Sequence, residues 1–220
     1  SAFYLAGFLQ VIRIRTGSTG SIDPNQSFIS NLGAGLTYVY RTPTLLAIVL
    51  LALFHCGLTM SFESLLPVLS SQQLDAKGAG FSFMMMAVGA GALTSVGVLA
   101  GVRNETAKGK IFLSLGVLSG LSPVALAVST TMPMALMSAA AMGATQAGFM
   151  TLTHTMIQAI VPDGIRGRVG AVYSVHIGGM MAIANLFNGV LADHMKASLL
   201  LGIGGILFIM AMIISWKLVT

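Results

Sequence analysis

Residues 44–69 read TLLAIVLLALFHCGLTMSFESLLPVL, with Glu63 as the only charged residue among them. A helix needs about 20 mainly apolar residues to cross the hydrocarbon core of a bilayer, and this stretch is longer than that. Thr42 is suited to cap a helix, and Pro43 is suited to its first position. These residues predict a membrane-spanning helix.

The composition of the whole chain agrees with that prediction. Of the 220 residues, 55% are hydrophobic and 8% are charged, and the mean hydropathy is +0.90. Soluble domains carry about 25% charged residues and disordered chains are poorer still in apolar residues, so both classes are excluded. The net charge of +5 therefore predicts membrane orientation, with no nucleic-acid partner.

The remaining apolar stretches extend the pattern along the chain. Residues 1–12 are apolar but would rise only about 18 Å as a helix, so we expect the end of a truncated span. Residues 13–43 are expected to form a cytoplasmic linker, in which 27–41 is an amphipathic helix on the membrane surface or an ordinary connecting helix. The predicted fold is an all-α polytopic membrane helix bundle over 44–220, with six complete transmembrane helices at 44–69, 79–102, 111–128, 133–160, 169–192 and 197–216.

The positive charges test this arrangement, because Lys and Arg collect on the cytoplasmic side. With the end of the first apolar segment placed inside, alternation leaves only Lys77 and Lys196 outside. The inner loops and ends then carry Arg13, Arg15, Arg41, Arg103, Lys108, Lys110, Arg166, Arg168 and Lys217. The split predicts a multi-pass protein with a cytoplasmic C-terminus.

Polar side chains within the first full span are candidates for chemistry, since ionisable groups in a bilayer usually face a cavity or the bundle interior. His55, Thr59 and Glu63 follow at steps of four and are expected to form one stripe. Pro67 removes the helical donor of the Glu63 carbonyl and predicts a kink. The stripe is interpreted as a proton or cation site. The alternatives are a carboxylate that reaches the outer interface and a structural, hydrogen-bonded histidine.

Two later spans also carry polar residues, whereas 111–128 and 197–216 contain no ionisable group. Gln146 in 133–160, and His176 and Asn185 in 169–192, are expected to line the same cavity. Hydrogen bonding between helices would give the same pattern. The distribution of polar residues therefore predicts a bundle in which 44–69, 133–160 and 169–192 are central and 111–128 and 197–216 are peripheral.

Signatures of catalysis and cofactor binding are missing from the sequence. It contains no phosphate-binding loop, no G-x-G-x-x-G and no H-E-x-x-H, and the single Cys56 excludes a C-x-x-C metal site. We expect no enzymatic activity, no cofactor and no metal.

Two cytoplasmic loops combine glycine with charge. Asp163, Arg166 and Arg168 lie in one, and Arg103 lies in the other. They are expected to form a charged gating loop between helix ends, although topogenic charge alone would also account for the cations.

The chain resembles the C-terminal half of a major facilitator superfamily transporter, spans seven to twelve, and within it the bacterial enterobactin and macrolide exporter group. The matching stretches are LGAGLTYVYRTPTLLAIVLL (32–51), SLLPVL (64–69), AVGAGALTSVGVLAG (87–101) and IVPDGIRGRVGAVYS (160–174). The loop after 79–102 departs from the family pattern, because Asn104 stands where an Asp is common.

The resemblance implies a function and the partners that go with it. It implies secondary active, proton-coupled export of small amphipathic or hydrophobic molecules, such as drugs or siderophores, by alternating access in a bacterial inner membrane. It also implies a missing N-terminal six-helix half as partner, with the substrate between the halves. The alternative is a self-contained six-helix module that acts as a homodimeric channel or scaffold.

Overall fold

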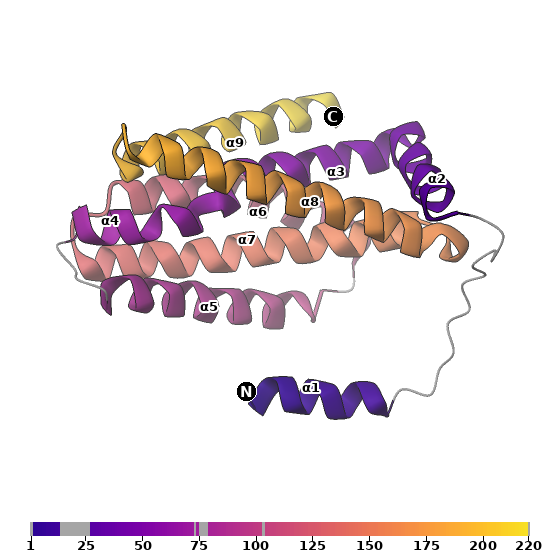
Figure 1. Cartoon of the computed structure of the whole chain (residues 1–220), viewed down its shortest axis with the longest axis horizontal. Coiled ribbons are helices and arrows are strands. Elements are labelled where there is room, and N and C mark those ends of the chain that lie inside the picture. Colours follow the sequence, from indigo (N-terminus) through magenta and orange to yellow (C-terminus); the bar gives the residue numbers. More distant parts are fainter. Residues whose placement is uncertain (1, 14–26, 73, 75–78, 103, 220) are drawn as a thin grey trace.

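The computed structural model describes residues 2–13, 27–72, 74, 79–102 and 104–219, and among these it contains helices and no strand (Figure 1). The first two helices precede the bundle, and α1 makes no extensive contact with the other described helices. The helices are α1 (Ala2–Ile12), α2 (Phe28–Arg41), α3 (Pro43–His55), η1 (Cys56–Met60), η2 (Ser61–Ser64), α4 (Leu66–Gln72), α5 (Ala79–Leu99), α6 (Glu105–Ala127), α7 (Met132–Ile160), α8 (Asp163–Ala192) and α9 (Ala197–Val219).

Five described segments are long and apolar enough to cross a membrane. They are Pro43–Ser64, Ala79–Leu99, Ala107–Ala127, Asp163–Ala192 and Ala197–Trp216. The predicted count of six is not reached on this measure, because α7 is absent from the set. That helix has 29 residues, which is ample length, but it carries the buried polar side chains Ser138, Thr145, Gln146 and Thr153. The fold is a polytopic helical bundle, as predicted.

Small residues set the closest helix contacts in the bundle. A Cβ added at Gly91 of α5 would overlap the Ala140 carbonyl of α7, and one added at Gly143 of α7 would overlap the Val88 carbonyl of α5. The pair Gly120 and Gly205 makes the same kind of contact between α6 and α9. Without side chains at these points the backbones approach closely, which is how membrane helices gain packing energy. As a result, α7 packs against both α5 and α6, and α6 also packs against α9.

Helix α8 packs against α3, η1 and η2, and α2 packs against α8 near the start of α8 (Figure 1). Helix α2 is amphipathic, as predicted, and Ser27 caps it by accepting a hydrogen bond from the Ser30 N–H at 3.2 Å. Its Gly35 lies against the Arg168 carbonyl, where an added Cβ would approach to 2.8 Å. Its opposite face exposes Ile29 by 79% and Tyr40 by 55%.

Several predicted boundaries differ from the structure. The span predicted at 111–128 belongs to a helix that begins at Glu105, and the one predicted at 169–192 belongs to a helix that begins at Asp163. Hydropathy detects the apolar part of a helix, whereas the backbone hydrogen-bond ladder continues through polar residues. The residues predicted as a gating loop at 162–168 therefore form the first turns of α8.

Candidate functional site

The span predicted at 44–69 is broken in its middle. Regular helix ends at His55, a π-helical turn covers Cys56–Met60, a 3₁₀ turn covers Ser61–Ser64, and α4 begins at Leu66. A π-turn has hydrogen bonds between residues five apart and a 3₁₀ turn between residues three apart. Neither matches the spacing of four in an α-helix, so the α-helical register is lost. The predicted stripe of His55, Thr59 and Glu63 is therefore wrong, because it assumes one continuous α-helix.

Local side chains stabilise this break. The Thr59 hydroxyl donates to the His55 carbonyl at 2.7 Å, and the Ser61 hydroxyl donates to the Gly57 carbonyl at 2.8 Å. Hydroxyl groups that bond back to the preceding turn compete with the regular ladder and bend helices. Gly204 of α9 lies against the Leu58 carbonyl, so the π-turn also packs closely on a neighbouring backbone. Pro67 follows as the second residue of α4, where its missing N–H costs no helical bond.

Two side-chain amides from other helices brace the break. The Gln146 amide nitrogen of α7 donates to the Thr59 carbonyl at 3.0 Å, in a buried position. The Asn188 amide nitrogen of α8 donates to the Ser61 carbonyl and to its hydroxyl, both at 2.9 Å. Irregular backbone at membrane depth is tolerated where neighbouring helices satisfy its polar groups in this way. Gln146 and Asn188 therefore act together as braces of one discontinuous helix.

Asn188 is absent from the predicted site residues, although an amide inside an apolar helix is a signal for interhelical bonding. Its contact with Ser61 joins residues far apart in the sequence, so spacing alone does not reveal it. A cavity of about 140 Å³ lies beside the break and is lined in part by Thr59, Ser61 and Asn188. The remaining lining comes mainly from apolar side chains of α8 and α9. The break therefore has free space next to it.

His55 points away from the exposed side of the break. Its Nε2 lies 2.6 Å from the Ser119 hydroxyl of α6, and its ring lies 4.5 Å from that of Phe149 and 5.0 Å from that of Phe208. The residue is 0% exposed. His55, the last residue of α3, therefore packs against α6, α7 and α9. The ring is packed and its Nε2 is hydrogen-bonded, whereas its Nδ1 is buried without a hydrogen-bond partner among the described residues.

Glu63 lies in the 3₁₀ turn with an exposed side chain, and no cation of the described residues forms an ion pair with it. Of the two predicted α8 residues, His176 is half-buried, its Nδ1 lies 2.8 Å from the Val172 carbonyl, and its ring lies 6.4 Å from that of Tyr40. The Asn185 amide oxygen is buried without a hydrogen-bond partner among the described residues. Among the predicted residues, a hydrogen bond joins Thr59 to Gln146, and none between the described residues joins either of them to Glu63, His176 or Asn185.

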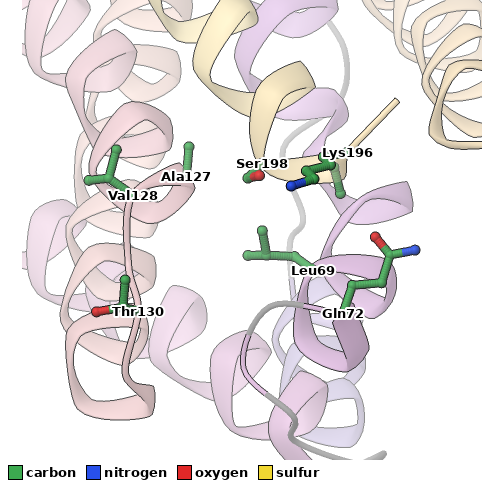
Figure 2. A pocket seen from close by; sticks show the side chains of 8 residues that line it. Leu69, Gln72, Ala127, Val128, Thr130, Lys196 and Ser198 are labelled. Carbon is green, nitrogen blue, oxygen red and sulfur yellow. The ribbon is translucent and has the colours of Figure 1, made fainter. Parts of the chain in front are cut away.

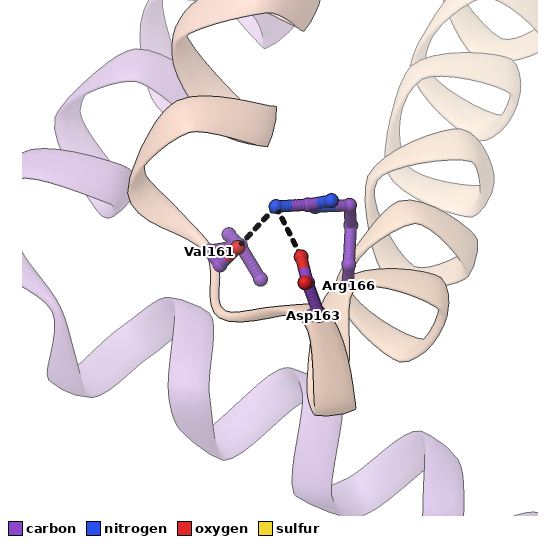
Figure 3. A network of polar contacts seen from close by, with 3 residues as sticks. All are labelled: Val161, Asp163 and Arg166. Atoms are coloured by element: carbon purple, nitrogen blue, oxygen red, sulfur yellow. Dashed lines mark hydrogen bonds and ion pairs between the residues drawn. The ribbon is translucent and has the colours of Figure 1, made fainter. Parts of the chain in front are cut away.

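The charged residues at the start of α8 form a local cluster (Figure 3). Arg166 pairs with Asp163 at 2.7 Å and donates to the Val161 carbonyl at 3.2 Å, so it ties the end of α7 to the first turn of α8. Both side chains are well exposed, at 48% and 84%, and such a pair contributes at most about 1 kcal/mol. Arg168 contacts α2 through its backbone. Arg103 lies outside the described residues.

A comparison with known protein families shows to which family the chain belongs. A family model described as transmembrane secretion effector (MFS_3) matches residues 1–219. The chain belongs to this family. No curated protein and no solved structure matches it significantly.

Membership of the transmembrane secretion effector family confirms the coarser part of the predicted resemblance. The protein is a multi-pass membrane transporter of the major facilitator type. Such proteins bind and move solutes, and the polar groups of broken helices commonly form their binding sites. In this family member the irregular segment 56–64, with its braces and Glu63, is the candidate functional site.

Proposed function

We propose that the protein takes part in proton-coupled export of small amphipathic or hydrophobic molecules, such as drugs or siderophores, across a bacterial inner membrane. This keeps the specific resemblance to the enterobactin and macrolide exporters as a hypothesis. The observation that carries it is the break at 56–64, which holds an exposed carboxylate within a segment of membrane-spanning length. Ionisable groups in such places are costly and are retained mainly for ion or substrate pathways.

In the proposed mechanism the break is the flexible point of the span. Helix α3 is held by the buried residues Leu45, Ile48 and Val49, and α4 is held by Leu66 and Leu69 in another buried cluster, so the irregular turns join two packed parts. Alternating access requires one part of the bundle to rock against another, and irregular turns absorb such changes in backbone angle. Glu63 would exchange its proton as α4 moves. Gln146 and Asn188 would hold the turn in register between the two states.

The partner in this proposal is a six-helix N-terminal half. Helices α5 and α8 offer exposed faces to this second half. None of the most apolar 18-residue stretch of α8 is buried, and only 11% of the corresponding stretch of α5 is buried. Their large exposed side chains include Met86, Leu93, Leu186 and Phe187. In the two-half architecture, the substrate site lies between the halves near the midplane. The exposed faces support the proposal of a second half that covers them in part.

The test uses the full coding sequence that contains this chain, expressed in a bacterium that lacks its own major dye exporters. Everted membrane vesicles are given an inward-acidic pH gradient and the amphipathic dye rhodamine 6G. We expect dye uptake that depends on the gradient and collapses with a protonophore. The result that contradicts the proposal is uptake equal to that of vesicles without the protein, for rhodamine 6G and for a panel of further amphipathic dyes.

A further inference from the structure

A second cavity lies where α4, α6 and α9 end or begin, at the end of the bundle opposite the Asp163–Arg166 pair (Figures 1 and 2). Its volume is about 420 Å³. Figure 2 shows Lys196 and Ser198 on one side and Val128 and Thr130 on the other. Neither the break at 56–64 nor its braces line this cavity, so it is separate from the candidate functional site.

The lining combines one positive charge with uncharged polar groups and an apolar floor. Lys196 is the only charged side chain among the described residues that line the cavity. Hydroxyl and amide groups come from Thr130, Ser198 and Gln72. Leu69, which is 1% exposed, supplies part of the apolar surface. A cation with several neutral donors and no carboxylate among these residues is complementary to an anionic group.

The position of the cavity decides between a free anion and an amphiphile. It lies at the ends of the membrane-length segments 107–127 and 197–216, which is the level of lipid headgroups. Val128, which lines the cavity, is 59% exposed, and Leu199, which follows the lining residue Ser198 in the chain, is 50% exposed, so exposed apolar side chains lie next to the cavity. An anion with an attached hydrocarbon chain can contact both the polar lining of the cavity and the apolar side chains next to it, whereas a free anion contacts only the polar lining.

We propose that this cavity binds the headgroup of an anionic glycerophospholipid. The lipid phosphate lies beside the Lys196 ammonium, with Ser198 and Thr130 as further hydrogen-bond donors. The acyl chains follow the apolar surface at Val128 and Leu199. The proposal requires only that the protein is embedded in a bilayer, so it does not depend on the direction or coupling of transport.

The experiment measures the thermal stability of the purified, delipidated protein in a neutral detergent. Phosphatidylglycerol, phosphatidylcholine with the same acyl chains, and sn-glycerol 3-phosphate are titrated separately, and apparent affinities are taken from the shift in Tm. We expect phosphatidylglycerol to raise Tm most. Lys196→Gln should weaken its apparent affinity about fivefold, since one cation near an anionic lipid is worth about that factor. Lys196→Arg should preserve the affinity.

The matched control is Lys110→Gln, which removes an exposed lysine from the first turns of α6, remote from the cavity. It should leave the phosphatidylglycerol affinity unchanged. Equal shifts with phosphatidylglycerol and phosphatidylcholine would overturn the proposal. So would an unchanged affinity in Lys196→Gln, or an equal loss in both lysine variants. Binding of sn-glycerol 3-phosphate as tight as that of the lipid would show a site for a free phosphate ester instead.

Discussion

The brace between Gln146 and the Thr59 carbonyl makes a sharp prediction about stability. Gln146 is 3% exposed, and its amide donates over 3.0 Å to the π-helical turn. Gln146→Leu keeps nearly the same side-chain volume, so it creates little cavity and mainly removes the hydrogen bond. Gln146→Asn keeps an amide but shortens the side chain by one carbon–carbon bond. That amide no longer reaches the Thr59 carbonyl.

The size of the effect follows from measured costs of such bonds. Hydrogen bonds between membrane helices contribute about 0.6 kcal/mol on average and up to about 1.7 kcal/mol. Thr59 belongs to an irregular turn with few alternative donors, so we expect a loss near the upper value, about 1.5 kcal/mol, for Gln146→Leu. Gln146→Asn should lose at least as much, because it also buries an unpaired amide, which costs about 1–3 kcal/mol.

The assay is reversible unfolding in mixed micelles, combined with amide hydrogen exchange of segment 56–64. The matched control is Gln158→Leu, which changes an exposed glutamine on the same helix and should alter the free energy of unfolding by less than about 0.5 kcal/mol. Exchange in 56–64 should accelerate in the Gln146 variants alone. The bracing argument is refuted if Gln146→Leu and Gln158→Leu have equal stability and equal exchange rates in this segment.

Three further predictions rest on other contacts. Gly143→Ala should lower stability by about 1–3 kcal/mol, because its Cβ overlaps the Val88 carbonyl, while Gly97→Ala, which has open space around it, should change little; equal effects would contradict the close α5–α7 packing. Ser119→Ala should cost about 1–3 kcal/mol in the same unfolding assay by leaving the His55 Nε2 unpaired, and the exposed Ser114→Ala serves as its control; a loss below about 0.5 kcal/mol would contradict the contact. Arg166→Gln should cost less than about 1 kcal/mol, and a loss above about 2 kcal/mol would show that the Asp163 pair is more than a local tie.

The sequence was sufficient for the helical bundle and insufficient for the break. Apolar length predicted the polytopic helical bundle, and Pro43 marked the start of α3 correctly. Gln146 bonds to the π-turn at Thr59 and Asn188 bonds to the 3₁₀ turn at Ser61, and both side chains approach the break only in the folded bundle. Periodicity assumes a constant turn per residue, so it carries no information about such a change.

The direction of His55 and the nature of the charged cluster were also beyond the sequence. A histidine in an apolar span is compatible with a cavity or with a buried partner, and only the position of Ser119 distinguishes the two. Asp163 stands between Pro162 and Gly164, and Arg166 precedes Gly167, a mixture of charge, proline and glycine that is typical of a loop. In the structure the same residues lie in the first turns of a helix. The negative charge of Asp163 interacts favourably there with the positive end of the helix dipole.

In the proposed function, Glu63 couples proton movement to transport at the break in the span. The most direct measurement compares two modes of rhodamine 6G transport in proteoliposomes that contain the full-length protein or its Glu63→Gln variant. Accumulation driven by a pH gradient requires the proton, whereas exchange of labelled for unlabelled dye without a gradient requires only alternating access. We expect Glu63→Gln to lose gradient-driven accumulation and to retain exchange, while Asp193→Asn, which neutralises an exposed carboxylate at the end of α8, should retain both. Gradient-driven accumulation at the wild-type level in Glu63→Gln would contradict the proposed coupling role of Glu63.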